Sequence, residues 1–156
     1  YPLYGIVSWF MTSRKERVRK RAALVEALFS VLAASSVSLL IRCIWHRPRP
    51  FTRGRTARIT HGDNASFPSN HTLNAVAAAF SLILSRQSGG KRLLGWALLQ
   101  GISRVFAGVH YTSDIIGSAV LAAGCAVRVH SSQRLRKLSR QLAYVCTEAE
   151  DILRRK

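Results

Sequence analysis

Three residues with chemically active side chains, Arg104, His110 and Asp114, lie in an otherwise apolar part of the sequence. His110 and Asp114 are four residues apart, so a helical turn would place both on one face, within hydrogen-bonding reach. A carboxylate bound to one ring nitrogen fixes the histidine tautomer, and the other nitrogen can then attack an electrophile or donate a proton. The same residues also suit a helix end whose polar side chains merely cap and solvate the turn. Taken alone, residues 103–114 leave both interpretations open.

A second stretch places two arginines around a helix end. Arg42 ends a long apolar segment, and Arg49 follows between Pro48 and Pro50, which stop a helix and hold the backbone extended. Guanidinium groups bind phosphate oxygens in bidentate fashion and stay charged in any environment. The alternative is that these arginines reach the headgroups of membrane lipids.

A third stretch, residues 65–72, comes directly before an apolar segment. Pro68 followed by Ser69 predicts a helix start with Ser69 near the N-cap. The first N–H groups of this helix, at Ser69, Asn70 and His71, would form an anion site together with the helix dipole. His71 would lie at the mouth of that site as a proton donor. A plain N-cap with an exposed histidine is the alternative.

The elements that must position these stretches are predicted to be membrane-spanning helices. Residues 22–41 carry one charge, Glu26, and are long enough to cross a bilayer core of about 30 Å. Shorter apolar segments follow at residues 72–85, 93–109 and 111–127. Residues 2–11 are interpreted as the end of a further span. The serial arrangement therefore predicts an all-α, polytopic membrane bundle.

The charge balance also requires an anionic partner and orients the bundle. The chain has 24 Lys and Arg against seven Asp and Glu, a net charge of +17, although 48% of its residues are apolar. A nucleic-acid-binding protein would explain this charge, but not an apolar span or arginines set between apolar segments. Basic clusters at residues 14–21, 86–92 and 128–140 all fall on one side of the predicted bundle, which the positive-inside rule makes cytoplasmic. The loop at residues 46–70 and the turn at His110 then lie on the opposite side.

The C-terminal segment predicts a different kind of helix. Its apolar residues recur at alternating three- and four-residue steps, and basic residues gather at its start. This pattern is typical of an amphipathic helix on the anionic cytoplasmic leaflet, and a short coiled-coil contact between subunits is the alternative. We therefore expect a membrane-embedded domain over residues 1–130 and a cytoplasmic helical tail over residues 131–156. The apolar stripe comprises Leu135, Leu138, Leu142, Val145, Ala149 and Ile152.

Three short patterns occur in order along residues 42–118, each next to an apolar segment. They read Arg-x6-Arg-Pro, Pro-Ser-Asn-His and Ser-Arg-x5-His-x3-Asp. Together they resemble the three-part motif of the type 2 phosphatidic acid phosphatase superfamily. Two positions depart from it, because Arg42 stands where lysine is usual and Asn70 where glycine is usual. Arginine keeps the charge, and asparagine keeps the backbone N–H.

Two longer matches, at residues 46–51 and 66–72, are similar to the bacterial undecaprenyl-diphosphatase branch of that superfamily. This resemblance implies hydrolysis of undecaprenyl diphosphate to undecaprenyl phosphate, the lipid carrier of cell-wall synthesis. It also implies a multi-pass protein of the bacterial cytoplasmic membrane with an extracytoplasmic active site. Phosphatidic acid and phosphatidylglycerophosphate are the alternative substrates, and the oligomeric state stays open. Members usually have more spans, so N-terminal residues are expected to be absent from the chain.

The resemblance also implies a role for each motif residue. His110 would attack the terminal phosphorus to give a phosphohistidine, Asp114 would orient His110, and His71 would protonate the leaving oxygen. No metal or cofactor is expected, because guanidinium groups replace the usual Mg²⁺ clamp and the sequence lacks a cluster of carboxylates to hold a divalent ion. The implied phosphate-binding residues are Arg42, Arg49, Ser69, Asn70 and Arg104.

Overall fold

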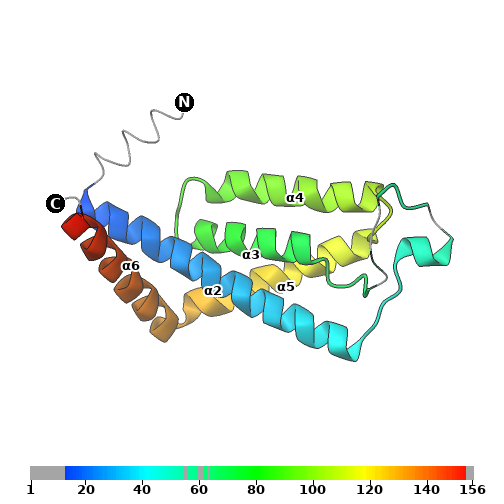
Figure 1. Ribbon diagram of the computed structural model, residues 1–156, viewed down its shortest axis with the longest axis horizontal. Helices are drawn as coiled ribbons and strands as arrows, with labels where there is room; N and C mark the ends of the chain where they lie inside the picture. Colours follow the sequence, from blue (N-terminus) through cyan, green and yellow to red (C-terminus); the bar gives the residue numbers. More distant parts are fainter. Residues whose placement is uncertain (1–12, 55, 60–61, 63, 154–156) are drawn as a thin grey trace.

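The protein is described by a computed structural model over residues 13–54, 56–59, 62 and 64–153. Within these residues the chain forms five α-helices and one short 3-10 helix, with no strand (Figure 1). The all-α prediction is confirmed, whereas the span predicted at residues 2–11 lies outside the described residues. The elements are α2 (Arg14–Ile44), η1 (Pro50–Arg53), α3 (Asn70–Leu84), α4 (Gly90–Phe106), α5 (Thr112–Ser131) and α6 (Gln133–Leu153).

Helix α3 lies at the centre of the bundle, in contact with α2, α4 and α5 (Figure 1). It contains no Asp, Glu, Lys or Arg, and Leu73, Val76 and Ala77 on it are buried. Small residues let helix backbones approach closely. The neighbouring helices accordingly meet α3 with the small residues Ala34, Ala97 and Ala122.

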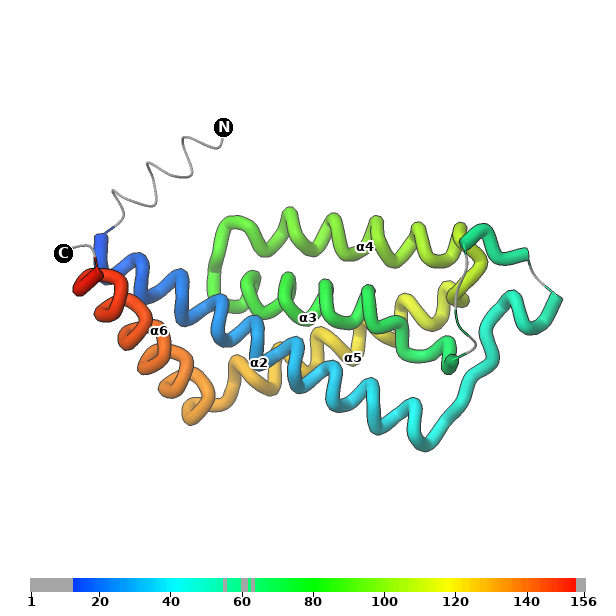
Figure 2. The backbone as a smooth tube through the Cα atoms, in the orientation of Figure 1, coloured from blue at the N-terminus to red at the C-terminus, as the bar shows by residue number. Residues whose placement is uncertain are grey.

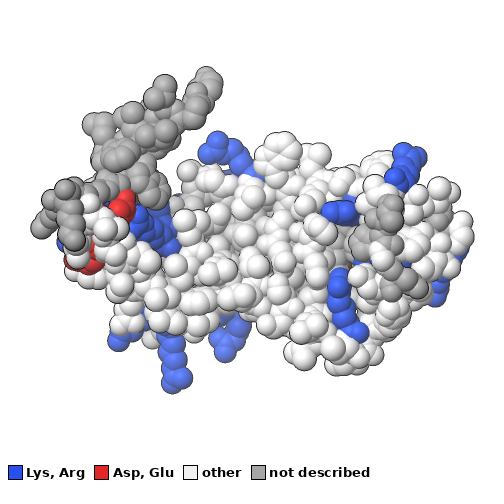
Figure 3. Space-filling model, viewed as in Figure 1, with Lys and Arg blue, Asp and Glu red and all other residues white. Residues whose placement is uncertain are grey.

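Many of the large apolar side chains point outward. A soluble bundle buries such residues, and a large exposed apolar surface marks contact with a membrane or another protein. In Figure 3 the Lys and Arg side chains gather toward the two ends of the molecule, with an uncharged stretch between them. This distribution is typical of a bundle whose middle lies in a bilayer. Exposed examples are Leu28 and Leu39 on α2, Trp96 and Phe106 on α4, and Ile116 and Val120 on α5.

Two of the four predicted spans have the length and composition of a membrane-crossing helix. These are α2, with 31 residues, and α5, with 20 residues. Helices α3 and α4 are shorter, at 15 and 17 residues. Helix α3 packs against α2, α4 and α5, which cover much of its surface.

Helix α6 folds back along the N-terminal half of α2 (Figure 2). It contacts α2 through small or polar residues, Ser139, Ala143 and Thr147, which are buried. Ion pairs join the two helices between Arg17 and Asp151, at 2.6 Å, and between Arg21 and Glu150. The predicted apolar stripe faces away from the bundle: Leu138, Leu142, Val145 and Ile152 are exposed.

The two ends of the bundle differ in content. The start of α2, the α3–α4 turn and the α5–α6 junction lie together at one end, so the three basic clusters share that end (Figure 1). The α2–α3 connection and the α4–α5 turn lie together at the opposite end. All three motif stretches therefore meet at one end of the molecule.

Candidate active site

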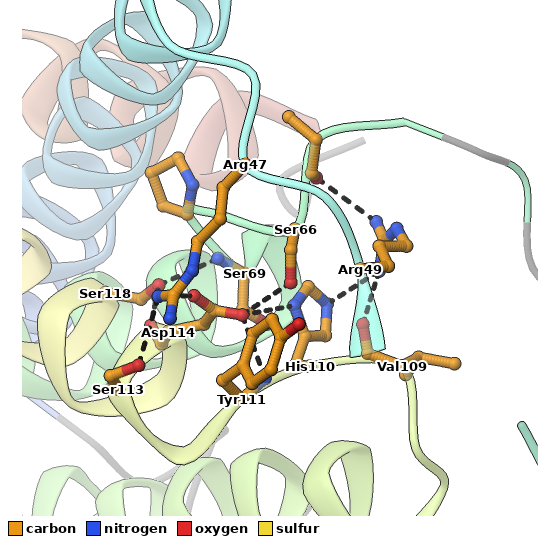
Figure 4. Close-up of polar contacts among 12 residues, drawn as sticks. Arg47, Arg49, Ser66, Ser69, Val109, His110, Tyr111, Ser113, Asp114 and Ser118 are labelled. Atoms are coloured by element: carbon orange, nitrogen blue, oxygen red, sulfur yellow. Dashed lines mark hydrogen bonds and ion pairs between the residues drawn. The ribbon is translucent and has the colours of Figure 1, made fainter. Parts of the chain in front are cut away.

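Arg49 joins the three motif stretches. Helix α2 ends at Ile44, and the backbone is extended at Arg49, whose side chain is 2% exposed. Its Nε donates to the Asn64 carbonyl at 2.9 Å, and its Nη2 donates to Asn64 Oδ1 at 2.5 Å and to the Ala65 carbonyl at 3.3 Å. Its Nη1 donates to the Val109 carbonyl at 2.8 Å. The guanidinium thus holds the loop before α3 against the turn before α5 (Figure 4).

The turn between α4 and α5 is a Schellman motif. The N–H of Val109 donates to the carbonyl of Arg104 at 3.3 Å, and the N–H of Gly108 donates to that of Val105 at 3.0 Å. Gly108 has a φ of +74°, and a Cβ there would lie 2.4 Å from the Thr56 carbonyl oxygen. Only glycine fits both constraints, so Gly108 fixes where the following histidine lies.

We expect Gly108→Ala to destabilise the protein by about 1–3 kcal/mol, because alanine at a positive φ is strained and its methyl group meets Thr56. Thermal unfolding in detergent measures the effect. Gly124→Ala is the matched control, because a Cβ at Gly124 meets no atom within 4 Å and alanine favours the helix interior. A Gly108→Ala protein as stable as the Gly124→Ala protein would contradict the prediction.

His110 and Asp114 meet in a buried pair, although not in the geometry that the spacing predicts. His110 lies before Tyr111, the N-cap of α5, and so is not a turn of helix away from Asp114. Its Nδ1 is nevertheless 3.6 Å from Asp114 Oδ2, and both side chains are buried. Arg49 Nη1 lies 3.4 Å from His110 Nε2 (Figure 4). Because arginine has only donors, Nε2 accepts and the ring proton lies on Nδ1, facing the carboxylate.

The Asp114 carboxylate is held from several sides. Its Oδ2 accepts from Ser66 Oγ at 2.5 Å and from the N–H of Tyr111 at 2.9 Å. Its Oδ1 accepts from Arg47 Nη1 at 2.5 Å. The side chain is fully buried in the first turn of α5, where the helix dipole favours a negative charge. These contacts fix the carboxylate in place beside His110.

Arg47 and Ser66 are residues whose part in the site the sequence reasoning missed. Arg47 pairs with Asp114, donates to Ser113 Oγ at 3.0 Å and lies over the ring of Tyr111, 4.5 Å from its centroid. Arg47 precedes Arg49 and Ser66 precedes Pro68, each inside a motif stretch, and this position was the one signal in the sequence that they belong to the site. Nothing in the local sequence specifies Asp114 as the partner of either.

The start of α3 matches the prediction in position but not in every hydrogen bond. Ser69 is the N-cap, and it is fully buried. Its N–H, expected to bind an anion, instead donates to Ser118 Oγ at 2.8 Å, so that donor serves to dock α3 on α5. The first intrahelical bond runs from the N–H of Leu73 to the carbonyl of Ser69, and Asn70 is the first helical residue, at the mouth of α3. The side chain of His71 is exposed there.

Two further arginines have guanidinium N–H groups without an acceptor among the described residues. Arg42 Nη2 donates to the Pro68 carbonyl at 2.8 Å, while its Nε is shielded from solvent and has no acceptor among the described residues. Arg104 is half-buried in the last turn of α4 and makes no side-chain hydrogen bond or ion pair to the part of the chain described. Asn70 Oδ1 accepts from Ser38 Oγ at 2.7 Å, which ties the α3 start to α2.

Across residues 13–153, within the ranges that the structure describes, no three His, Cys, Asp or Glu side chains form a group suited to a metal ion. Metal independence stays a prediction. This end of the bundle carries guanidinium, imidazole and backbone N–H groups, which are donors that bind phosphoryl oxygens in proteins.

Comparison with known proteins agrees with this chemistry. The sequence model of the PAP2 superfamily matches residues 23–137, so the chain belongs to this superfamily. An undecaprenyl-diphosphatase, BcrC of Bacillus subtilis (strain 168), is 31% identical over 123 residues, 78% of this chain and 62% of that protein. The decaprenylphosphoryl-5-phosphoribose phosphatase of Mycobacterium tuberculosis (strain ATCC 25618 / H37Rv) is 29% identical over 123 residues, 76% of this chain and 68% of that protein.

A solved structure supports the fold. The crystal structure of Aquifex aeolicus LpxE superposes with a TM-score of 0.64 at 21% sequence identity, covering 83% of this chain and 76% of that one. At this identity the likeness concerns the fold alone. The chain spans about three fifths of the length of the Bacillus subtilis relative.

Proposed function

We propose that the chain is a membrane lipid phosphatase that converts undecaprenyl diphosphate to undecaprenyl phosphate through a phosphohistidine at His110. The observation that carries the proposal is the orientation of the His110 ring. Its Nδ1 faces a buried carboxylate, and its Nε2 accepts from Arg49, so Nε2 carries a lone pair and no proton. An imidazole held in this tautomer is suited to attack an electrophile.

In the proposed reaction the terminal phosphoryl group replaces His110 as the acceptor for Arg49 Nη1. The Nε2 lone pair then forms the N–P bond while the P–O bond to the leaving group breaks, and Asp114 stabilises the imidazolium. Water next attacks the phosphorus, releases inorganic phosphate and restores the neutral ring. The contact between His110 and Asp114 is long at 3.6 Å, and such contacts often tighten only in the reacting complex.

Charge around the phosphoryl group would come from residues that still have donors. Arg42 and Arg104 each keep guanidinium donors, and Asn70 adds a backbone N–H at the mouth of α3. Ser69 acts through its cap of α3 and its bond to Ser118. In phosphoryl transfer such positioning and charge stabilisation account for most of the rate enhancement.

The membrane arrangement forms part of the proposal. The apolar outer surface and the two span-length helices support a multi-pass protein of the bacterial cytoplasmic membrane. The basic end would be cytoplasmic by the positive-inside rule, and the His110 end extracytoplasmic. Residues 1–130 would then be the membrane-embedded phosphatase domain. Residues 131–156 would be a cytoplasmic tail whose apolar stripe on α6 enters the leaflet.

Phosphate release from purified protein in detergent with EDTA tests the proposal. Undecaprenyl diphosphate is compared with phosphatidic acid, phosphatidylglycerophosphate and a polyprenyl-linked sugar phosphate, the last because of the relative from Mycobacterium tuberculosis. We expect the diphosphate to give the largest kcat/KM. A larger value for any monoester would reassign the substrate, and activity that disappears with EDTA would contradict the metal-free mechanism.

His71→Ala is expected to reduce the hydrolysis of phosphate monoesters more than that of diphosphates. An alkoxide leaving group needs a proton, so kcat/KM for a monoester should fall by about 10²–10⁴-fold. The leaving group of a diphosphate is already a stable phosphate monoester, so that substrate should lose less than about tenfold. His46→Ala, an exposed histidine in the α2–α3 connection, is the control and should change neither. Equal losses for both substrates would contradict the general-acid role.

A further inference from the structure

A cavity lies at the basic end of the bundle, away from His110. It has a volume of about 430 Å³ and is bounded by α2, the end of α3, the end of α5 and α6. Four basic residues line it, Lys15 and Arg19 from α2 and Arg136 and Arg140 from α6. The proposed phosphatase reaction uses none of them.

The cations come from α2 and α6. Apart from Glu26, the acidic residues of these two helices pair with basic residues that do not line the cavity. The pairs are Arg14 with Glu148, Arg17 with Asp151, Lys20 with Glu16 and Arg21 with Glu150. The remaining acid, Glu26, lines the cavity and pairs with His130, with 3.0 Å between Glu26 Oε2 and His130 Nδ1. The four lining cations form no ion pair with any described residue. Four positive charges therefore face one carboxylate, and the cavity favours an anion.

A buried donor in the cavity wall also lacks an acceptor. The Nε of Arg136 is shielded from solvent and has no hydrogen-bond partner within the described ranges. A buried guanidinium N–H without an acceptor is costly, and phosphate oxygens are good acceptors for it. This feature is independent of the charge count and indicates the same kind of ligand.

The apolar part of the wall distinguishes a lipid from a free anion. Val18, Ala22 and Ala23 of α2 complete the lining beside the cations. The cavity lies near the ends of α2 and α5, the two helices of span length, which is the depth of lipid headgroups in the proposed membrane arrangement. On α6 the neighbouring Leu138 and Leu142 are exposed. Cations at phosphate depth next to an apolar wall match an amphiphile with an anionic head.

We propose that this cavity binds the phosphate headgroup of an anionic phospholipid from the leaflet opposite the active site. The phosphate would lie between the α2 and α6 cations and join the two helices. The glycerol backbone and the start of the acyl chains would lie against Ala22 and Ala23. The bound lipid thereby fixes α6 against α2, so it stabilises the folded protein by mass action.

Binding of phosphatidylglycerol and phosphatidylcholine with identical acyl chains tests this site. Full-length protein in neutral detergent is titrated with each lipid and followed by native mass spectrometry and thermal unfolding. The His110→Ala protein is used, so that binding is measured without turnover and does not depend on the proposed phosphatase activity. We expect phosphatidylglycerol to bind and raise Tm, and phosphatidylcholine to bind at least about tenfold more weakly.

Two double variants remove the cations from opposite walls. Arg136→Gln with Arg140→Gln, and separately Lys15→Gln with Arg19→Gln, should each weaken phosphatidylglycerol binding by about tenfold or more. Lys91→Gln with Arg92→Gln is the matched control, because it removes the same charge from exposed positions at the same end of the bundle. The control should bind like the parent protein.

Three results would overturn the proposal. Equal weakening in the control would show diffuse attraction to a basic surface. Equal binding of phosphatidylcholine would show that the anionic head is not recognised. Inorganic phosphate or pyrophosphate that displaces phosphatidylglycerol at the concentration of the lipid would assign the cavity to a small anion. Using both double variants keeps the test decisive if one of them fails to fold.

Discussion

His110→Ala is expected to reduce phosphate release by about 10⁴-fold or more, because the exchange removes the nucleophile proposed to form the covalent intermediate. The structure also indicates which ring nitrogen of His110 should carry the phosphoryl group. Nε2 is the ring atom that faces Arg49, and Nδ1 faces Asp114, so the phosphoryl group should be carried on Nε2. Rapid quench with substrate labelled in the terminal phosphate should trap an acid-labile, base-stable label on the parent protein and none on His110→Ala.

The control for this experiment is His46→Ala, which removes an exposed histidine from the α2–α3 connection. It should retain both turnover and the labelled intermediate. Phosphate release by purified His110→Ala protein at a rate near that of the parent would exclude His110 as the nucleophile. A label on the parent protein that mapped to His71 instead would exchange the two roles.

Arg49→Lys is expected to have the second largest effect, although it keeps the charge. The Arg49 guanidinium directs all of its N–H groups at acceptors in Asn64, Ala65, Val109 and His110. Lysine has three donors on one nitrogen and cannot reproduce that planar fork. Buried carbonyls would lose their partners at about 1–3 kcal/mol each, and His110 would lose the donor that sets its tautomer.

We therefore expect Arg49→Lys to lower both the unfolding temperature and kcat, the latter by about 10²-fold or more. Arg53→Lys is the matched control, because Arg53 is exposed at the end of η1 and the same exchange there should change neither quantity. A variant with normal stability and only a raised KM would mean that Arg49 binds phosphate without organising the site. That result would support phosphate binding, which the family motif implies for Arg49, over the organising role that its hydrogen bonds indicate.

Much of the secondary structure could be predicted because its causes are local. Ser69 was expected near the N-cap of a helix and is the N-cap of α3. The prolines around Arg49 predicted an extended backbone, and Arg49 has one. The apolar stripe over residues 135–152 predicted a helix, and α6 spans Gln133–Leu153. Each pattern depends on side-chain spacing or on a backbone restriction within a few residues.

The partners of the site residues were less predictable because they are distant in the sequence. Arg47 and Ser66 bind Asp114 across 67 and 48 residues, and Ser69 binds Ser118 across 49. The spacing of His110 and Asp114 predicted a shared helical face, yet His110 precedes the helix. Such contacts depend on how closely α3 and α5 approach, and small buried residues along many positions decide that together.

The sequence by itself therefore determined the chemical groups, their order and the family, since the motif residues of the PAP2 superfamily can be identified without coordinates. The tertiary structure decided what those groups do to one another. It directed the guanidinium of Arg49 at protein carbonyls and at Nε2 of His110, used the N–H of Ser69 for docking, and left donors on Arg42 and Arg104. The physical reason is that a hydrogen bond needs both partners at about 3 Å, and only the packing of distant helices sets that distance.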